Sequence, residues 1–159
     1  DWLLIAGSCR KENFEQQWGE DQMEIVKKLN IPASFFYNKV IESVLYDIRM
    51  QTGKDISEKQ LGNFEYVKIF SKTQRAKIKI DKLEKDSSYH FSTSTTKNEF
   101  RAGYDIKPID EKSCEIHYTE KMESFGNLQK MNDAVLGIMM GFLKKRQFKK
   151  MLDQIEKSY

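Results

Sequence analysis

The sequence predicts an α+β fold in which a curved antiparallel sheet of about six strands wraps around a long C-terminal helix. The first indication is the hydrophobic pattern, which has a period of two through most of the segment from Phe64 to Glu123 and a helical period from Gly126 to Tyr159. The second is the order of the elements, because one strand and one helix precede this run of strands. Sheet and final helix each have an apolar face to cover, so we expect them to pack on each other.

A strand and an amphipathic helix open the domain. Alternating apolar residues predict a strand over Glu24–Ile31, and apolar residues at helical spacing predict a helix over Pro32–Gln51. In this helix Asp47 falls on the charged face, opposite the apolar stripe. Gly53 provides a stop signal, and Ser57–Leu61 is expected to form a short second helix.

The following segments alternate apolar and polar residues and are separated by short polar turns, which predicts antiparallel neighbours with one covered face. The expected strands are Phe64–Ser71, Arg75–Leu83, Tyr89–Thr96, Phe100–Lys107 and Cys114–Met122. The last segment, Gly126–Tyr159, carries two apolar stripes and is long enough for about nine helical turns. Its basic run, Lys144–Lys150, is interpreted as a solvated face, with acidic lipid or phosphate as the alternative partner.

Composition and charge exclude several functional classes. The net charge of the 159 residues is only +3, which gives no support to nucleic-acid binding. The most apolar stretch, Ala134–Leu143, has about half the length needed to cross a bilayer, so no stable membrane insertion is expected. Cys9 and Cys114 are too few for a disulfide framework and are expected to be inert thiols. We therefore expect a cytoplasmic protein without a cofactor; the oligomeric state stays open.

Residues 1–22 show neither period, and we assign residues 23–159 to a single domain. Two interpretations of the first segment stay open. In one, Met23 is the natural start and the preceding residues are a non-native leader, since codons for Trp18–Asp21 can contain a purine-rich ribosome-binding site. In the other, the segment is a genuine N-terminal helix. N-terminal sequencing of protein made from its own promoter distinguishes them, because a mature chain beginning at Asp1 or earlier excludes the leader.

The order of elements resembles the helix-grip superfamily of START, polyketide-cyclase and birch-pollen-allergen-like proteins. The resemblance covers residues 23–159 and rests on the strand that runs into Pro32–Phe36, the short second helix, the strands, and the helix beginning near Gly126. The segments Phe64–Lys68, Ser92–Thr96 and Met122–Gly126 are also similar to a family of small, uncharacterised bacterial proteins in that superfamily. The resemblance implies the fold, but not one function, because superfamily members include lipid carriers, cyclases and chaperone regulators.

Inward-facing side chains of the strands should meet the C-terminal helix, and Gly137 and Gly141 reduce the bulk of that helix. The functional interpretation is a cavity for a small hydrophobic or amphipathic ligand, with Tyr104 and Tyr118 as polar handles; the alternative is a filled core. The resemblance contributes most of the support for a cavity. The expected lining residues are Ile78, Ile80, Phe91, Tyr104, Ile116, Tyr118, Glu120, Val135, Ile138, Met139 and Phe142.

Three polar residues are candidates for chemistry. Glu120 shares the inward phase of its strand, so it is either a buried carboxyl with a raised pKa or a residue at a strand end that reaches solvent. His90 and His117 share the charged phase and are interpreted as surface residues, without the ligand spacing of a metal site.

The leading function is non-catalytic ligand binding. The alternatives are a cyclase- or hydrolase-type enzyme using Glu120 or Tyr118 as an acid, and a protein-interaction module with a filled core.

Overall fold

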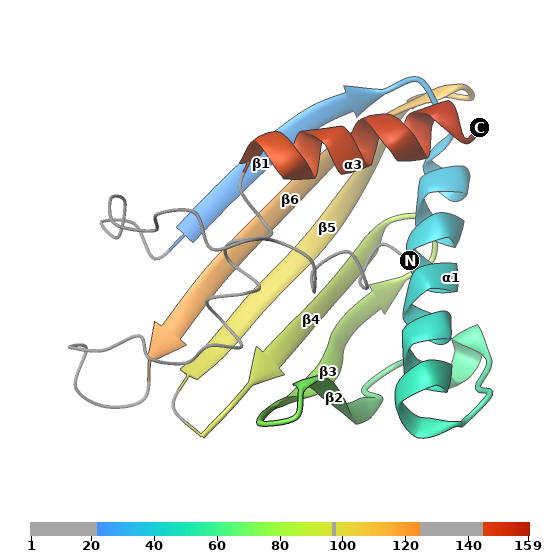
Figure 1. The fold of residues 1–159 in the computed structure, drawn as a ribbon. Helices are drawn as coiled ribbons and strands as arrows, with labels where there is room; N and C mark the ends of the chain where they lie inside the picture. Colours follow the sequence, from blue (N-terminus) through green and yellow to red (C-terminus); the bar gives the residue numbers. More distant parts are fainter. Residues whose placement is uncertain (1–21, 97, 125–144) are drawn as a thin grey trace.

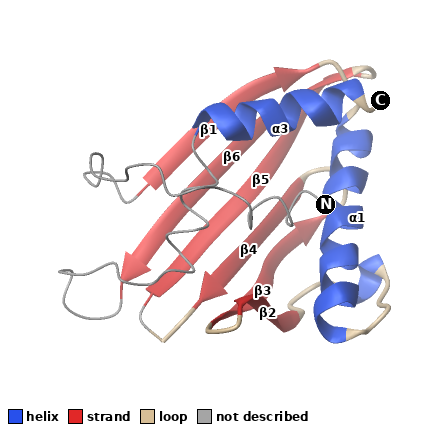
Figure 2. Ribbon diagram, in the orientation of Figure 1, coloured by secondary structure: helices blue, strands red, loops and turns tan. Residues whose placement is uncertain are grey.

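The computed structural model describes residues 22–96, 98–124 and 145–159. These residues form one six-stranded antiparallel sheet in the order β1-β6-β5-β4-β3-β2, with two α-helices on one face (Figures 1 and 2). In chain order the elements are β1 (Gln22–Leu29), α1 (Ala33–Thr52), the short 3-10 helix η2 (Glu58–Gln60), β2 (Glu65–Ser71), β3 (Gln74–Glu84), β4 (Ser88–Ser94), β5 (Asn98–Asp110), β6 (Ser113–Ser124) and α3 (Lys145–Lys157).

The predicted α+β architecture is confirmed, because each predicted strand is present and every pairing is antiparallel. Helix α1 ends where expected, at Gly53, whose φ of +72° suits glycine far better than a residue with a side chain. The last strands are longer than predicted, since β5 continues to Asp110 and β6 to Ser124. The proposed leader and the predicted helix start at Gly126 lie outside the described residues.

Both helices cover the same face of the sheet, which we call the inner face. The ring of Phe36 in α1 lies 5.6 Å from the ring of Tyr104 in β5, which places α1 over this face. Lys27, beside Ile116 in the register, donates to Asp153 of α3 across the β1 edge. Leu152 of α3 is fully buried in the core between the sheet and the helices. Among the described residues, none of the helices is long and apolar enough to cross a membrane.

A β-bulge in β3 places two consecutive side chains on the opposite, outer face. The register shifts between Ile80, which pairs with Phe91, and Lys82, which pairs with His90. Asp81 therefore also faces outward, where its carboxylate accepts a hydrogen bond from Ser92 at 3.3 Å. The bulge returns Leu83 to the inner face beside Tyr89, so the apolar lining continues to the end of the strand.

A buried polar cluster joins α1 to β2. Asp47 is only 2% exposed, although its place in the helical pattern predicted the charged, outward face. Its Oδ2 accepts a hydrogen bond from the hydroxyl of Tyr66 at 2.5 Å, and its Oδ1 lies 3.1 Å from Nζ of Lys68. The prediction for Asp47 was wrong because it considered only the helix, whereas β2 supplies a hydroxyl donor to Oδ2 and a cation beside Oδ1 of the buried carboxylate.

We predict that Lys68→Ala lowers the free energy of unfolding by about 3–5 kcal/mol, because it leaves the carboxylate of Asp47 buried without a cation. Urea denaturation measures this change. The matched control is Lys39→Ala, which removes a partly exposed i,i+3 pair with Glu42 and a cation–π contact with Phe35 and should cost less than about 1.5 kcal/mol. Similar losses in the two variants would contradict the role assigned to the buried pair.

Candidate functional site

The register of three neighbouring strands places three tyrosines side by side on the inner face. Tyr89 of β4 pairs with Tyr104 of β5, which in turn pairs with Tyr118 of β6. The ring centroids of Tyr104 and Tyr118 are 4.9 Å apart, and those of Tyr89 and Tyr104 are 6.4 Å apart. Tyr118 is 1% exposed, whereas Tyr104 is only partly buried. This tyrosine row forms an aromatic surface at the centre of the sheet.

Glu120 lies one inward position beyond Tyr118 on β6. It is 4% exposed, so the interpretation of a strand end reaching solvent is wrong. Its cross-strand partner on β5 is Ala102, whose methyl group takes up little of the space beside the carboxyl. The hydroxyl of Tyr118 hydrogen-bonds to the Glu120 carboxyl, but Oε1 has no partner among the described residues. An unsatisfied buried carboxyl oxygen is rare in native proteins and suggests a functional role.

Burial raises the pKa of Glu120 to about 8, and the hydrogen bond from Tyr118 opposes this rise only in part. The carboxyl is therefore mostly neutral near pH 7 and can donate a hydrogen bond as well as accept one. Desolvation, with the nearby carboxyl as a second cause, raises the pKa of Tyr104 and of Tyr118 above the usual value for a phenol. The site is thus a set of neutral polar groups on an apolar surface.

The structure brings several of the predicted lining residues together. Ile80, Ile116 and Tyr118 are buried on the inner face, as is Ile78 at 5% exposure. Phe91 and Tyr104 lie between them and are partly buried. The predicted helix residues lie outside the described residues: Val135, Ile138, Met139 and Phe142.

Three residues of the inner face were missed. Tyr89 stacks on Phe91 with their centroids 5.5 Å apart, and its alternation in β4 could have identified it. Ala102 was passed over because its importance comes from the register with Glu120, which no single segment reveals. Thr93 is a polar residue that was not among the expected lining residues, yet it is fully buried and its Oγ1 has no partner among the described residues.

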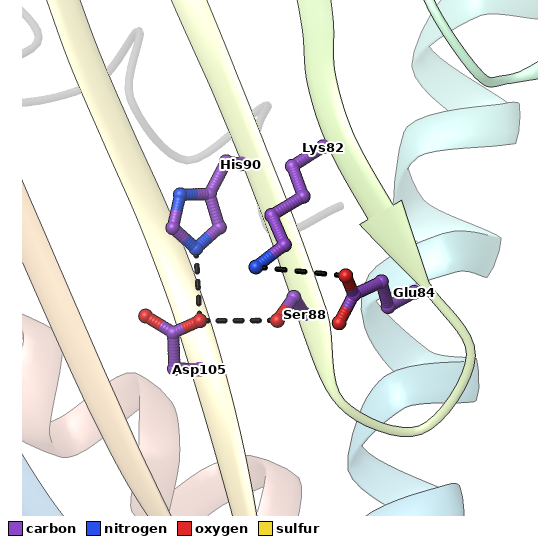
Figure 3. A network of polar contacts seen from close by, with 5 residues as sticks. All are labelled: Lys82, Glu84, Ser88, His90 and Asp105. Carbon is purple, nitrogen blue, oxygen red and sulfur yellow. Dashed lines mark hydrogen bonds and ion pairs between the residues drawn. The ribbon is translucent and has the colours of Figure 1, made fainter.

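A separate polar network lies on the outer face (Figure 3). Nε2 of His90 lies 2.9 Å from Oδ1 of Asp105, and the hydroxyl of Ser88 donates to the same oxygen at 3.1 Å. Partial burial works against ionisation of Asp105, but its bonds with His90 and Ser88 outweigh that effect and lower its pKa. Because Ser88 bonds to the carboxylate of Asp105 and not to His90, the histidine does not activate the serine as a nucleophile.

The prediction that His90 and His117 lie at the surface is confirmed, since the side chain of His90 is 32% exposed and that of His117 is 43% exposed. The ring of His90 lies on Gly103, where an added Cβ would come within 2.6 Å of the ring. His117 pairs with Glu24 of β1. Cys114 is fully buried, and desolvation raises the pKa of its thiol to about 11, which makes it a poor nucleophile, as expected. The inner face is therefore the stronger candidate for function.

We predict that the stability of the protein falls as the pH rises from about 4.3, the ordinary pKa of a glutamate, to about 8. In this window the folded protein retains a proton on Glu120 that the unfolded chain has released, so raising the pH favours unfolding by up to about 1.4 kcal/mol per pH unit.

Urea denaturation at a series of pH values measures this slope. Glu120→Gln has no charge to bury, so it should lose this part of the slope and be more stable than the natural protein at about pH 8, by about 1–3 kcal/mol. The same slope in both proteins would show that Glu120 has an ordinary pKa.

Comparison with solved structures identifies the fold as the helix-grip fold and confirms the resemblance drawn from the sequence. Ara h 8.0201 matches with a TM-score of 0.58 and 9% identity, over 86% of this chain and 95% of that protein. The aromatase/cyclase ZhuI from Streptomyces sp. R1128 matches with a TM-score of 0.53 and 12% identity, over 86% and 92%. Protein MLL2253 from Mesorhizobium loti matches with a TM-score of 0.52 and 10% identity, over 84% and 95%. Such identities establish the fold alone.

A search of the curated proteins found no match. A family model described as "Domain of unknown function (DUF3284)" matches residues 23–141.

Proposed function

The chain belongs to the DUF3284 family and has the helix-grip fold, and we propose that it binds a small hydrophobic or amphipathic molecule without covalent chemistry. The proposed site is the inner face of the sheet, under the C-terminal helix. The tyrosine row and Phe91 would provide the apolar contact surface, and Glu120 with the tyrosine hydroxyls would orient the ligand.

One observation carries this proposal: the unsatisfied Oε1 of Glu120 beside a partly buried aromatic surface. In a filled core the central side chains would be fully enclosed, and each buried polar atom would have a partner. Phe91 and Tyr104 instead keep part of their surface accessible, although they lie in the middle of the strands. A bound molecule would cover these rings and could satisfy the carboxyl.

A second candidate function, acid catalysis, is favoured by the same carboxyl. A general acid works best when its pKa lies near the working pH, and burial raises the pKa of Glu120 to about 8. The hydroxyl of Tyr118, bonded to that carboxyl, could position a substrate or receive part of its developing charge. The relationship in fold to an aromatase/cyclase is compatible with this role but does not establish it.

Native mass spectrometry of protein purified from its own host tests for ligand binding directly. We expect a bound molecule that survives gentle ionisation, and fluorescence titration with prodan, a neutral naphthyl ketone, should show saturable binding. Ala102→Leu fills space beside Glu120 and should weaken prodan binding by at least about tenfold.

The matched control for this substitution is Val67→Leu, which enlarges a side chain that is 51% exposed on β2 and should leave binding unchanged. Thermal melting of both variants checks that they fold. No co-purified molecule together with no saturable prodan binding would contradict the proposal. Conversion of the co-purified molecule by the natural protein, but not by Glu120→Gln, would establish acid catalysis instead.

A further inference from the structure

We propose that the inner-face site selects neutral ligands that present a hydrogen-bond acceptor, such as a ketone or ester carbonyl, to the carboxyl of Glu120, and that it rejects carboxylates. This inference rests on the proposed function, since it specifies which chemical class the same site would bind.

The neighbours of Glu120 leave one oxygen of its carboxyl without a partner among the described residues. The side chain is 4% exposed, and its carboxyl faces inward from β6 beside the methyl group of Ala102. The hydrogen bond with Tyr118 occupies one side of the carboxyl and leaves Oε1 without a partner among the described residues. A ligand group placed next to Ala102 would therefore be able to bond to Oε1.

The carboxyl of Glu120 is protonated near pH 7. Its pKa of about 8, raised by burial, makes the neutral acid the main form near pH 7. The hydroxyl of Tyr118 donates a hydrogen bond to this carboxyl, so the carboxyl is an acceptor on that side and its own proton is not needed there. It is available on Oε1, where it needs an acceptor from the ligand.

The described groups around Glu120 provide no free positive charge for an anionic ligand. In the described part of the chain, the titratable groups that act on or respond to Glu120 are Tyr118 and Tyr104, both neutral phenols at this pH. Within the described ranges the cations on the inner face are already paired, Lys27 with Asp153 and Lys68 with Asp47. A ligand carboxylate would therefore be desolvated without a counter-charge, which is costly.

A protonated amine is also disfavoured by these features. Binding it would require Glu120 to ionise in its buried position and the amine to lose its hydration, so two desolvation costs oppose one ion pair. A neutral carbonyl requires neither, because it replaces one water hydrogen bond by one hydrogen bond from a neutral acid.

Four naphthalene derivatives of similar size test the inference: acetylnaphthalene, ethylnaphthalene, naphthylacetate and naphthylethylamine. Calorimetric titration of the natural protein at about pH 6 should give the tightest binding for acetylnaphthalene. We expect it to bind about tenfold more tightly than ethylnaphthalene, the effect of one buried hydrogen bond, and naphthylacetate to bind most weakly.

The pH dependence supplies an independent readout. At about pH 9.5 the carboxyl is ionised and can no longer donate, so the advantage of acetylnaphthalene over ethylnaphthalene should disappear. Glu120→Gln keeps an N–H donor at both pH values, so its preference should not change with pH.

The outcomes separate this inference from the function on which it rests. If all four compounds fail to bind, the proposed function and the inference both fail. Equal binding of acetylnaphthalene and ethylnaphthalene at about pH 6 would leave ligand binding intact and overturn the inference. Tightest binding of naphthylacetate or of naphthylethylamine would overturn it as well, and would identify an ionic site.

Discussion

The antiparallel register of β4, β5 and β6, which runs without a shift from Asn98 to Pro108 of β5, determines which side chains meet on the inner face. It aligns Tyr89, Tyr104 and Tyr118 in one row and Phe91, Ala102 and Glu120 in the next. Because successive side chains of a strand point to opposite faces, a slip of one residue would send the tyrosine row to the outer face and bring the histidines inward. The large apolar area of the inner face opposes such a slip, so the packing of the core also determines the composition of the site.

In the described part of the chain two carboxyl groups are buried, Asp47 on α1 and Glu120 on the inner face, and their surroundings differ strongly. Asp47 accepts a hydrogen bond from Tyr66 and forms an ion pair with Lys68, and these two contacts connect α1 to the edge strand β2. Glu120 has a single hydrogen-bonding neighbour, Tyr118, and retains an unsatisfied oxygen among the described residues. A paired charge is typical of a structural role, whereas an unpaired buried carboxyl is destabilising unless something else compensates for it. This contrast is the physical reason for assigning function to Glu120 and structure to Asp47.

Much of the architecture could be predicted from the sequence because the two hydrophobic periods are clear. Alternation identified the strands, and the inward phase of Cys114, Ile116 and Tyr118 correctly assigned Glu120 to the same face. What could not be predicted depends on neighbours that are distant in the sequence. The burial of Asp47 requires β2, and the bulge after Ile80 requires the register with β4. The role of Ala102 follows only from its pairing with Glu120.

To serve the proposed site, Glu120 must be a buried, neutral carboxyl that can donate a hydrogen bond to a ligand. A carbon NMR titration of the Glu120 side chain, in the empty protein and with acetylnaphthalene, measures its protonation state. We expect a pKa of about 8 in the empty protein and a higher pKa with the ketone bound, because the ligand favours the protonated form. A pKa of about 4.3 that the ketone does not change would show that Glu120 is an ionised carboxylate and not a hydrogen-bond donor.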